Sequence, residues 1–205
     1  KFEKQDFGWA AKSTNFFPIG WSRDGALFAY GSFWHSIAIA NSSGIGVVVQ
    51  DIVTDKIVWD SWKNWQESLV GDPGTEVYVP GSSDAAWKEI QAVVEQPLSQ
   101  NKIETGGNSD PVRFPIQNGD ELNVEIVEMP EINSAIPFAV RAVSRNFGVK
   151  TIFSSVRDAM NEASVLGYFP SPDGSRIAVI LAVRNAYPPY SPAYHVIGCH
   201  RELGF

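Results

Sequence analysis

The sequence of 205 residues contains one cysteine, no long apolar segment and no cluster of basic side chains. Because Cys199 stands alone, no disulfide can form within the chain, which is compatible with the cytoplasm and with a bacterial periplasm. The longest uninterrupted apolar run, Ile177 to Val183, has seven residues, whereas a membrane-spanning helix needs about 20. The sequence therefore predicts a protein with no membrane span.

Positive charge is scarce and scattered along the chain. The 16 Lys and Arg residues stand against 23 Asp and Glu residues, which gives a formal net charge of −7. Proteins that bind nucleic acid need a basic stripe to neutralise the phosphates, and an anionic membrane surface attracts basic segments for the same reason. We therefore expect neither nucleic acid nor a membrane surface as a partner.

Motifs for catalysis and metal binding are also missing. The segment 20–25 places a Ser between two glycines, as the nucleophile elbow of hydrolases does, but it is one residue too long. The three histidines, His35, His195 and His200, do not have the spacing of a zinc protease. The sequence thus predicts no catalytic residue, no metal site and no cofactor.

The composition is that of a folded domain with many short elements, since 44% of the residues are hydrophobic and 13 Pro and 17 Gly are spread along the chain. Hairpin-length turns separate most of the apolar runs. Strands are expected at 19–21, 26–30, 45–53, 56–59, 122–129, 138–144, 165–169, 176–182 and 194–199. We predict a mainly β fold of antiparallel sheets, with roughly ten strands and one or two short helices.

The first helix is expected at 83–96, with Pro97 ending it. The second is expected at 156–163, because Ser155 and Asp158 have the spacing of a capping box. The polar segment 98–110 is expected to be a long loop. The chain is interpreted as a single domain, 1–205, or as two halves, 1–97 and 111–205, joined by that loop.

Two turns near the ends of the chain share one pattern. The residues Ser22, Asp24, Gly25 and Ala29 recur as Ser171, Asp173, Gly174 and Ala178, at a constant offset of 149. Asp and Ser side chains bond to nearby backbone in such turns, and Gly accepts a positive φ. We interpret the pattern as an internal repeat.

The first copy continues into further matching pieces, which are Ser22-Arg-Asp-Gly25, Ala29-Tyr-Gly-Ser32, Val47-Val-Val-Gln-Asp51 and Thr54-Asp-Lys56, and Ser171-Pro-Asp-Gly174 restarts the pattern. These segments resemble blades of a WD40 or TolB-type β-propeller. Propeller repeats recur about every 40 residues, and a closed propeller has at least about four blades. We therefore expect blade-like strand units at both ends of the chain and no full propeller.

A second resemblance concerns three motifs, Trp21-Ser-Arg-Asp-Gly25, the late strand that runs from Ser171-Pro to Arg176-Ile-Ala-Val179, and Tyr194-His-Val-Ile-Gly198. They are similar to those of a family of predicted secreted bacterial proteins of unknown function. This resemblance implies export, to the periplasm or out of the cell, and supplies no activity.

Tryptophan is unevenly distributed, because all seven lie between Trp9 and Trp87. Trp21, Trp59 and Trp87 are expected in the core. The side chains expected to bind a ligand, since exposed aromatic faces can stack on sugars or grip a peptide, are Trp34, His35, Trp62 and Trp65, with Tyr187 and Tyr190 as a second rim.

These observations favour an exported, non-catalytic binding or interaction module with an aromatic groove for a glycan or a peptide. Two alternatives stay open. One is a glycoside-type hydrolase that uses the acidic cluster of Asp120, Glu121, Glu125, Glu128 and Glu131. The other is a component of an envelope assembly, which contacts another envelope protein and binds no small ligand.

Overall fold

The computed structural model describes residues 12–36, 42–66, 78–106, 110–118, 120–185 and 192–205. Within these ranges the chain forms one helix and twelve strands in three antiparallel sheets, which confirms the predicted mainly β class. The described strands build no closed barrel and no full propeller. The one described helix is not apolar enough along its length to cross a membrane.

Sheet A has five strands in the order β4-β3-β2-β1-β5. They are β1 (Lys12–Ser22), β2 (Leu27–Ser36), β3 (Ser42–Asp51), β4 (Lys56–Gln66) and β5 (Ile103–Thr105). One face of the sheet is covered by the helix α1 (Ser83–Gln100), which buries Ala86, Ile90 and Val94 against it. Since β5 pairs with β1, part of the segment expected to be a loop belongs to sheet A.

The helix begins as expected and ends later. Ser82 is its N-cap, and the Ser82 hydroxyl accepts a hydrogen bond from the backbone N–H of Ala85 at 3.3 Å. The predicted end at Pro97 is wrong, because α1 continues to Gln100 with Pro97 inside its last turns. The proline removes an N–H that would bond to the carbonyl of Val93. Val93 lies on the exposed side of the helix, where water can bond to that carbonyl instead.

Sheet C has four strands in the order β6-β7-β8-β9. They are β6 (Ile116–Asn118), β7 (Asp120–Glu128), β8 (Ala135–Ser144) and β9 (Gly148–Asp158). The predicted helix at 156–163 is wrong, since Val156 pairs with Pro137 at the end of β9. The Asp158 carboxylate accepts a hydrogen bond from the N–H of Met160 at 2.8 Å. Asp158, expected to be the acidic member of a capping box with Ser155, therefore shapes a turn between two strands.

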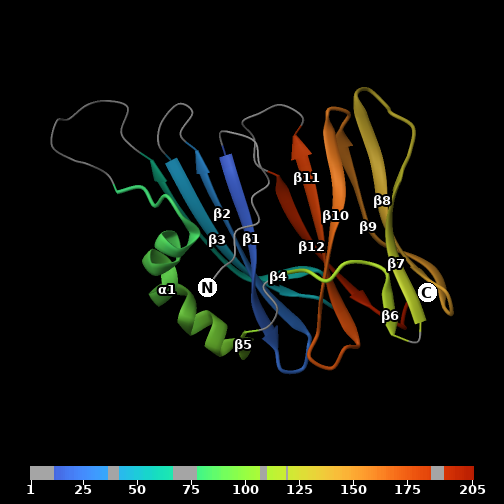
Figure 1. Ribbon diagram of the computed structural model, residues 1–205, viewed down its shortest axis with the longest axis horizontal. Helices are drawn as coiled ribbons and strands as arrows, with labels where there is room; N and C mark the ends of the chain where they lie inside the picture. The colour runs from blue at the N-terminus through green and yellow to red at the C-terminus, as the bar shows by residue number, and fades with distance from the viewer. Residues whose placement is uncertain (1–11, 37–41, 67–77, 107–109, 119, 186–191) are drawn as a thin grey trace.

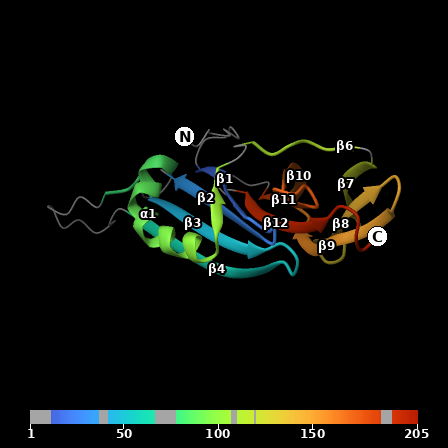
Figure 2. The ribbon, with the colours of Figure 1, turned by 90° about the horizontal axis from the view of Figure 1, so that it is seen from below.

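Sheet B lies between the other two sheets and has the order β10-β11-β12. Its strands are β10 (Asn161–Pro170), β11 (Arg176–Asn185) and β12 (Ala193–His200). One face packs on sheet A, where Phe169 and Ile180 meet Phe28. The other face packs on sheet C through a larger apolar cluster. Helix α1 and the sheets A, B and C thus follow one another across the molecule (Figures 1 and 2).

The repeated turns have the same hydrogen bonds. The Ser22 hydroxyl donates to the Asp24 carboxylate at 2.6 Å and accepts from the N–H of Leu27 at 2.8 Å. The equivalent Ser171 hydroxyl donates to Asp173 at 2.6 Å and accepts from the N–H of Arg176 at 3.0 Å. The following strands, β2 and β11, each have ten residues. The repeat proposed from the sequence is therefore visible in the local structure.

The offset of 149 also holds at the far ends of β3 and β12. The Asp51 carboxylate accepts from the N–H groups of Val53 and Thr54 at 2.7 and 3.1 Å. The equivalent His200 accepts through Nδ1 from the two N–H groups of residues 202 and 203, at 3.1 and 3.2 Å. Asp55 and its equivalent Gly204 both have a positive φ, of 57° and 84°. The two sheets thus share a template through the turn that follows their third strand.

The Ser171 hydroxyl is a stabilising contact that can be tested. Ser171 is 4% exposed and bridges a carboxylate and a backbone N–H. We expect Ser171→Ala to lower the free energy of unfolding by about 1–2 kcal/mol, because it leaves the N–H of Arg176 without its acceptor. Urea denaturation measures the change. Ser154→Ala, at an exposed position of β9, should change stability by less than about 0.5 kcal/mol; equal effects would contradict the assignment.

The same turn predicts sensitivity to acid. The hydrogen bond from Ser171 is the main cause that lowers the pKa of Asp173 from 3.8 to about 2. A lowered carboxyl pKa stabilises the fold above the unfolded value and loses that effect as the pH falls through the folded value. We therefore expect stability to fall between about pH 4 and pH 2, and Asp173→Asn to reduce that fall. Urea midpoints measured across this pH range test the prediction. If the variant loses as much stability as the parent between about pH 4 and pH 2, Asp173 is not the cause of the loss.

Candidate functional site

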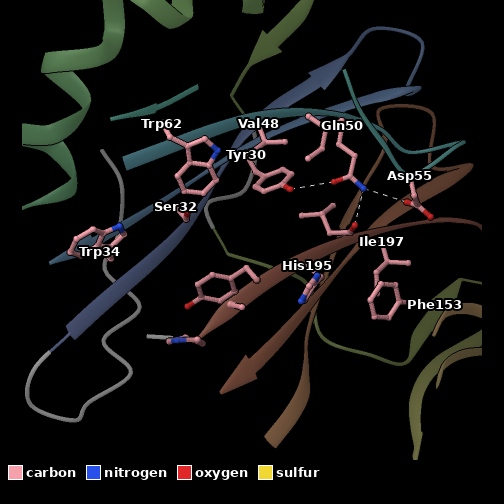
Figure 3. Close-up of a pocket in the computed structure, with 15 residues that line it drawn as sticks. Tyr30, Ser32, Trp34, Val48, Gln50, Asp55, Trp62, Phe153, His195 and Ile197 are labelled. Carbon is pink, nitrogen blue, oxygen red and sulfur yellow. Dashed lines mark hydrogen bonds between the residues drawn. The ribbon is translucent and has the colours of Figure 1, made fainter. Parts of the chain in front are cut away.

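A cleft of about 520 Å³ opens between sheet A and sheet B (Figure 3). Its volume lies within the range of about 300–1,000 Å³ that is usual for small-molecule sites. The described residues that line it are Tyr30, Ser32, Trp34, Val48, Gln50, Asp55, Ile57, Trp62, Phe153, Pro192, Ala193, Tyr194, His195, Val196 and Ile197. Most of this surface is apolar, and two tryptophans stand at one end of it.

The two walls of the cleft are of different kinds. Sheet A contributes alternate residues, such as Tyr30, Ser32 and Trp34 on β2, and alternate residues of a strand share one face. The segment 192–197 contributes six residues in succession, which requires that the strand turn its edge to the cleft. A ligand in the cleft therefore meets the face of sheet A, the edge of β12 and the Phe153 ring from β9 of sheet C.

The Trp62 ring lies flat on β3 of sheet A. Trp62 on β4 pairs with Gly46 on β3, and a Cβ atom at Gly46 would collide with three neighbouring atoms of the six-membered ring at nearly equal distances. Equal distances place the face of the ring over the glycine. The indole N–H donates to the Asp60 carboxylate at 3.0 Å, and the residue is 55% exposed. The sheet thus holds one face of the ring and leaves the other toward solvent.

Trp34 contacts the same strand from β2, the neighbour of β3 opposite to β4, and on the same face of the sheet. It pairs with Gly44, and a Cβ atom at Gly44 would collide with the Trp34 indole and with the Asn64 amide oxygen. Gly44 and Gly46 are two residues apart on β3, a spacing of about 7 Å. The two rings therefore lie next to each other along β3, and we call this pair the Trp34–Trp62 floor.

A hydrogen-bond network closes the opposite end of the cleft (Figure 3). The Tyr30 hydroxyl donates to the Gln50 amide oxygen at 3.3 Å. The Gln50 amide nitrogen donates to the Val196 carbonyl at 2.8 Å and to the Asp55 carboxylate at 3.4 Å. Asp55 also accepts from the backbone N–H of Gly198 at 2.7 Å. Side chains of sheet A thereby bond to the edge of β12 in the way a neighbouring strand would.

Burial sets the charge of the groups in the cleft. It raises the pKa of Tyr30 and of Tyr194 to about 12 and lowers the pKa of His195 below 6.5, so all three are neutral at neutral pH. Much of the Asp55 residue is exposed, yet desolvation of its carboxylate raises its pKa. Asp55 is the one acid among the described lining residues, and no Lys or Arg is among them.

The residues predicted to bind a ligand are separated by the fold. Trp34 and Trp62 share the cleft, whereas Trp65 packs in the apolar cluster beneath α1. His35 lies opposite Ser43, as Trp65 does, so both are on the helix-covered face of sheet A. Lining residues without a sequence signal were missed, among them Gln50 and Asp55. The two remaining predicted residues, Tyr187 and Tyr190, lie outside the described residues, as does Trp9.

The acidic cluster is remote from the tryptophans. Glu121 and Glu125 are exposed, and their side chains alternate with the buried Leu122 and Val124 that face sheet B. They therefore lie on the outer face of sheet C. Glu128 forms an ion pair with Arg157 at 2.6 Å. The exposed Glu131 follows β7, and Asp120 begins that strand.

Comparison with protein-family models, with curated proteins and with solved structures finds no match for this chain. The site is therefore interpreted from its own geometry.

The Asp55 contact between sheets A and B is testable. Asp55→Gly relieves the positive φ of 57° but removes the acceptor for the N–H of Gly198. We expect it to lower the free energy of unfolding by about 1–2 kcal/mol, because the loss of a hydrogen bond to a charged group outweighs the relief of the strained φ. Asp55→Asn keeps an acceptor oxygen and should cost less. Urea denaturation compares them, and a more stable glycine variant would contradict the role of the carboxylate.

Proposed function

We propose that the protein is a non-catalytic binding module that holds an extended ligand in the cleft, against the Trp34–Trp62 floor. The observation that carries the proposal is the position of Trp62. Its ring is fixed on one side by Gly46 and at its N–H by Asp60, while the residue stays 55% exposed. A rigid, exposed aromatic face costs little entropy to use in binding and buries a large apolar area.

The glycines of β3 support this proposal. A central strand of a sheet favours β-branched and aromatic residues, and glycine weakens it. Gly44 and Gly46 interrupt the apolar run of β3 where the two rings lie. Side chains at Gly44 and Gly46 would push the two rings away from the face of the sheet, and both positions are glycine.

The alternative functions have less support from the geometry. A glycoside-type hydrolase needs two carboxyl groups about 5–10 Å apart on either side of a bound sugar. The exposed Glu121 and Glu125 lie on the outer face of sheet C, and neither lines the cleft. A ligand-free envelope component leaves the exposed Trp62 without a role. Export from the cytoplasm stays a prediction from the sequence.

Removing the Trp62 ring tests the proposal. Binding is measured on an immobilised panel of glycans and unstructured peptides and then by titration calorimetry on the ligands retained. We expect Trp62→Ala to weaken binding by about tenfold or more, because the floor loses its exposed half. Phe147→Ala removes an aromatic ring that is 44% exposed and remote from the cleft, and it should bind as the parent does. Equal binding by both variants would exclude the floor as the site.

The glycine beneath the ring gives an independent test. Gly46→Ala places a methyl group where the Trp62 ring lies, so we expect the ring to move off the sheet and binding to fall by about tenfold. Gly81→Ala meets no atom within 4 Å and serves as the control for a glycine-to-alanine change. The proposal is wrong if Gly46→Ala folds and binds with the affinity of the parent.

A further inference from the structure

We infer that the ligand of this cleft is an uncharged carbohydrate chain; this inference rests on the proposed function and names its ligand class. It follows from what the floor offers, from the polar groups around it, from the charge of the lining and from the hydrogen bonds already made by β12.

The floor matches the flat face of a sugar ring. The face of an aromatic ring carries partial negative charge, and a pyranose ring presents a face of C–H groups with partial positive charge. Trp62 has one such face toward solvent, and Trp34 lies beside it along β3. The two glycines beneath the rings are about 7 Å apart along β3, so neighbouring units of one chain can contact both tryptophans.

Polar side chains surround the floor where hydroxyl groups of a stacked sugar would extend. Asp60 lies beside the indole N–H of Trp62 at 3.0 Å. The Asn64 amide oxygen lies over Gly44 with the Trp34 indole, and Ser32, two residues before Trp34 on β2 and opposite Gly46, also lines the cleft. Carboxylate, amide and hydroxyl groups together accept and donate, as sugar hydroxyls do. The floor thus combines an apolar centre with a polar border.

The charges near the floor disfavour acidic ligands. Asp55 lines the cleft and Asp60 borders it, while no Lys or Arg is among the described lining residues. His195 is neutral at neutral pH because desolvation lowers its pKa. Arg184, which acts on Tyr194, is outside the lining. Among the described lining residues, a sugar carboxylate would therefore meet acidic groups and no cation to pair with, at a cost in binding free energy.

The edge of β12 also disfavours an extended peptide. A peptide that adds to a sheet edge gains its affinity from main-chain hydrogen bonds. Here the Val196 carbonyl already accepts from Gln50, and the Gly198 N–H already donates to Asp55. A peptide strand would have to displace both side chains, whereas a sugar chain on the floor leaves them in place.

The test compares oligosaccharides of equal length by titration calorimetry on the full chain. Neutral chains of β-linked glucose, xylose or mannose are set against an oligogalacturonate, with an unstructured Trp-containing peptide as a third arm. We expect at least one neutral chain to bind in a way that Trp62→Ala weakens by about tenfold. The oligogalacturonate should bind at least about tenfold more weakly than that chain.

Two variants that each remove one negative charge test which acidic residue disfavours the oligogalacturonate. Asp60→Asn should narrow the difference in affinity between the neutral oligosaccharide and the oligogalacturonate. Glu121→Gln changes the net charge by the same amount on the outer face of sheet C, and should leave the difference unchanged.

The outcomes separate the two proposals. Binding of the peptide alone, lost in Trp62→Ala, overturns the carbohydrate assignment and leaves the binding module in place. Oligogalacturonate bound as tightly as the neutral chains also overturns it. If no ligand of any class depends on Trp62, the proposed function itself fails.

Discussion

The structure depends on one constraint, which is that β11 must be buried on both faces. Residues 177–181 are each 0% exposed, and they alternate between the cluster shared with sheet C and the cluster shared with sheet A. A strand buried on both faces is apolar without interruption, and this one carries the longest apolar run of the chain. Neither outer sheet can move away without exposing one side of it. The cleft exists because sheet A extends past the edge of sheet B while being held to it.

The strands and turns could be predicted because their signals are local. A turn that contains Ser, Asp and Gly forms its own hydrogen bonds, as Ser22 and Ser171 show. The helix at 156–163 was wrong because a capping-box spacing does not distinguish a helix cap from an Asp turn. Strand β9 was missed because its apolar residues do not alternate in the sequence, since a register shift next to Ile152 interrupts the alternation of its two faces. The order in which the three sheets pack could not be predicted from local sequence patterns, because all three sheets present apolar faces.

Part of the candidate site could be predicted, because the tryptophans are a local signal in the sequence, whereas contacts between distant strands are not. Exposure was expected for Trp34, Trp62 and Trp65, but the alternation of a strand sends Trp65 to the opposite face from Trp62. The signal that would have separated them was the pair Gly44 and Gly46 in an otherwise β-branched strand. Gln50 and Asp55 could not be found, because their partners on β12 lie more than 140 residues away in the chain.

The repeated turn after the third strand has the same hydrogen-bond pattern in both sheets but a different acceptor group in each. In sheet A the acceptor is the Asp51 carboxylate, whose pKa is lowered because the hydrogen bonds from Val53 and Thr54 outweigh its desolvation. In sheet B the acceptor is Nδ1 of His200, which must stay unprotonated to accept. Desolvation and the nearby Arg176 and Lys150 lower the pKa of His200, so its contribution is present at neutral pH and is lost as the pH falls through the lowered value. Protonation of His200 would therefore remove the acceptor from one copy of the turn and leave the carboxylate acceptor of the other in place, so the two sheets differ in how acid affects their last turn.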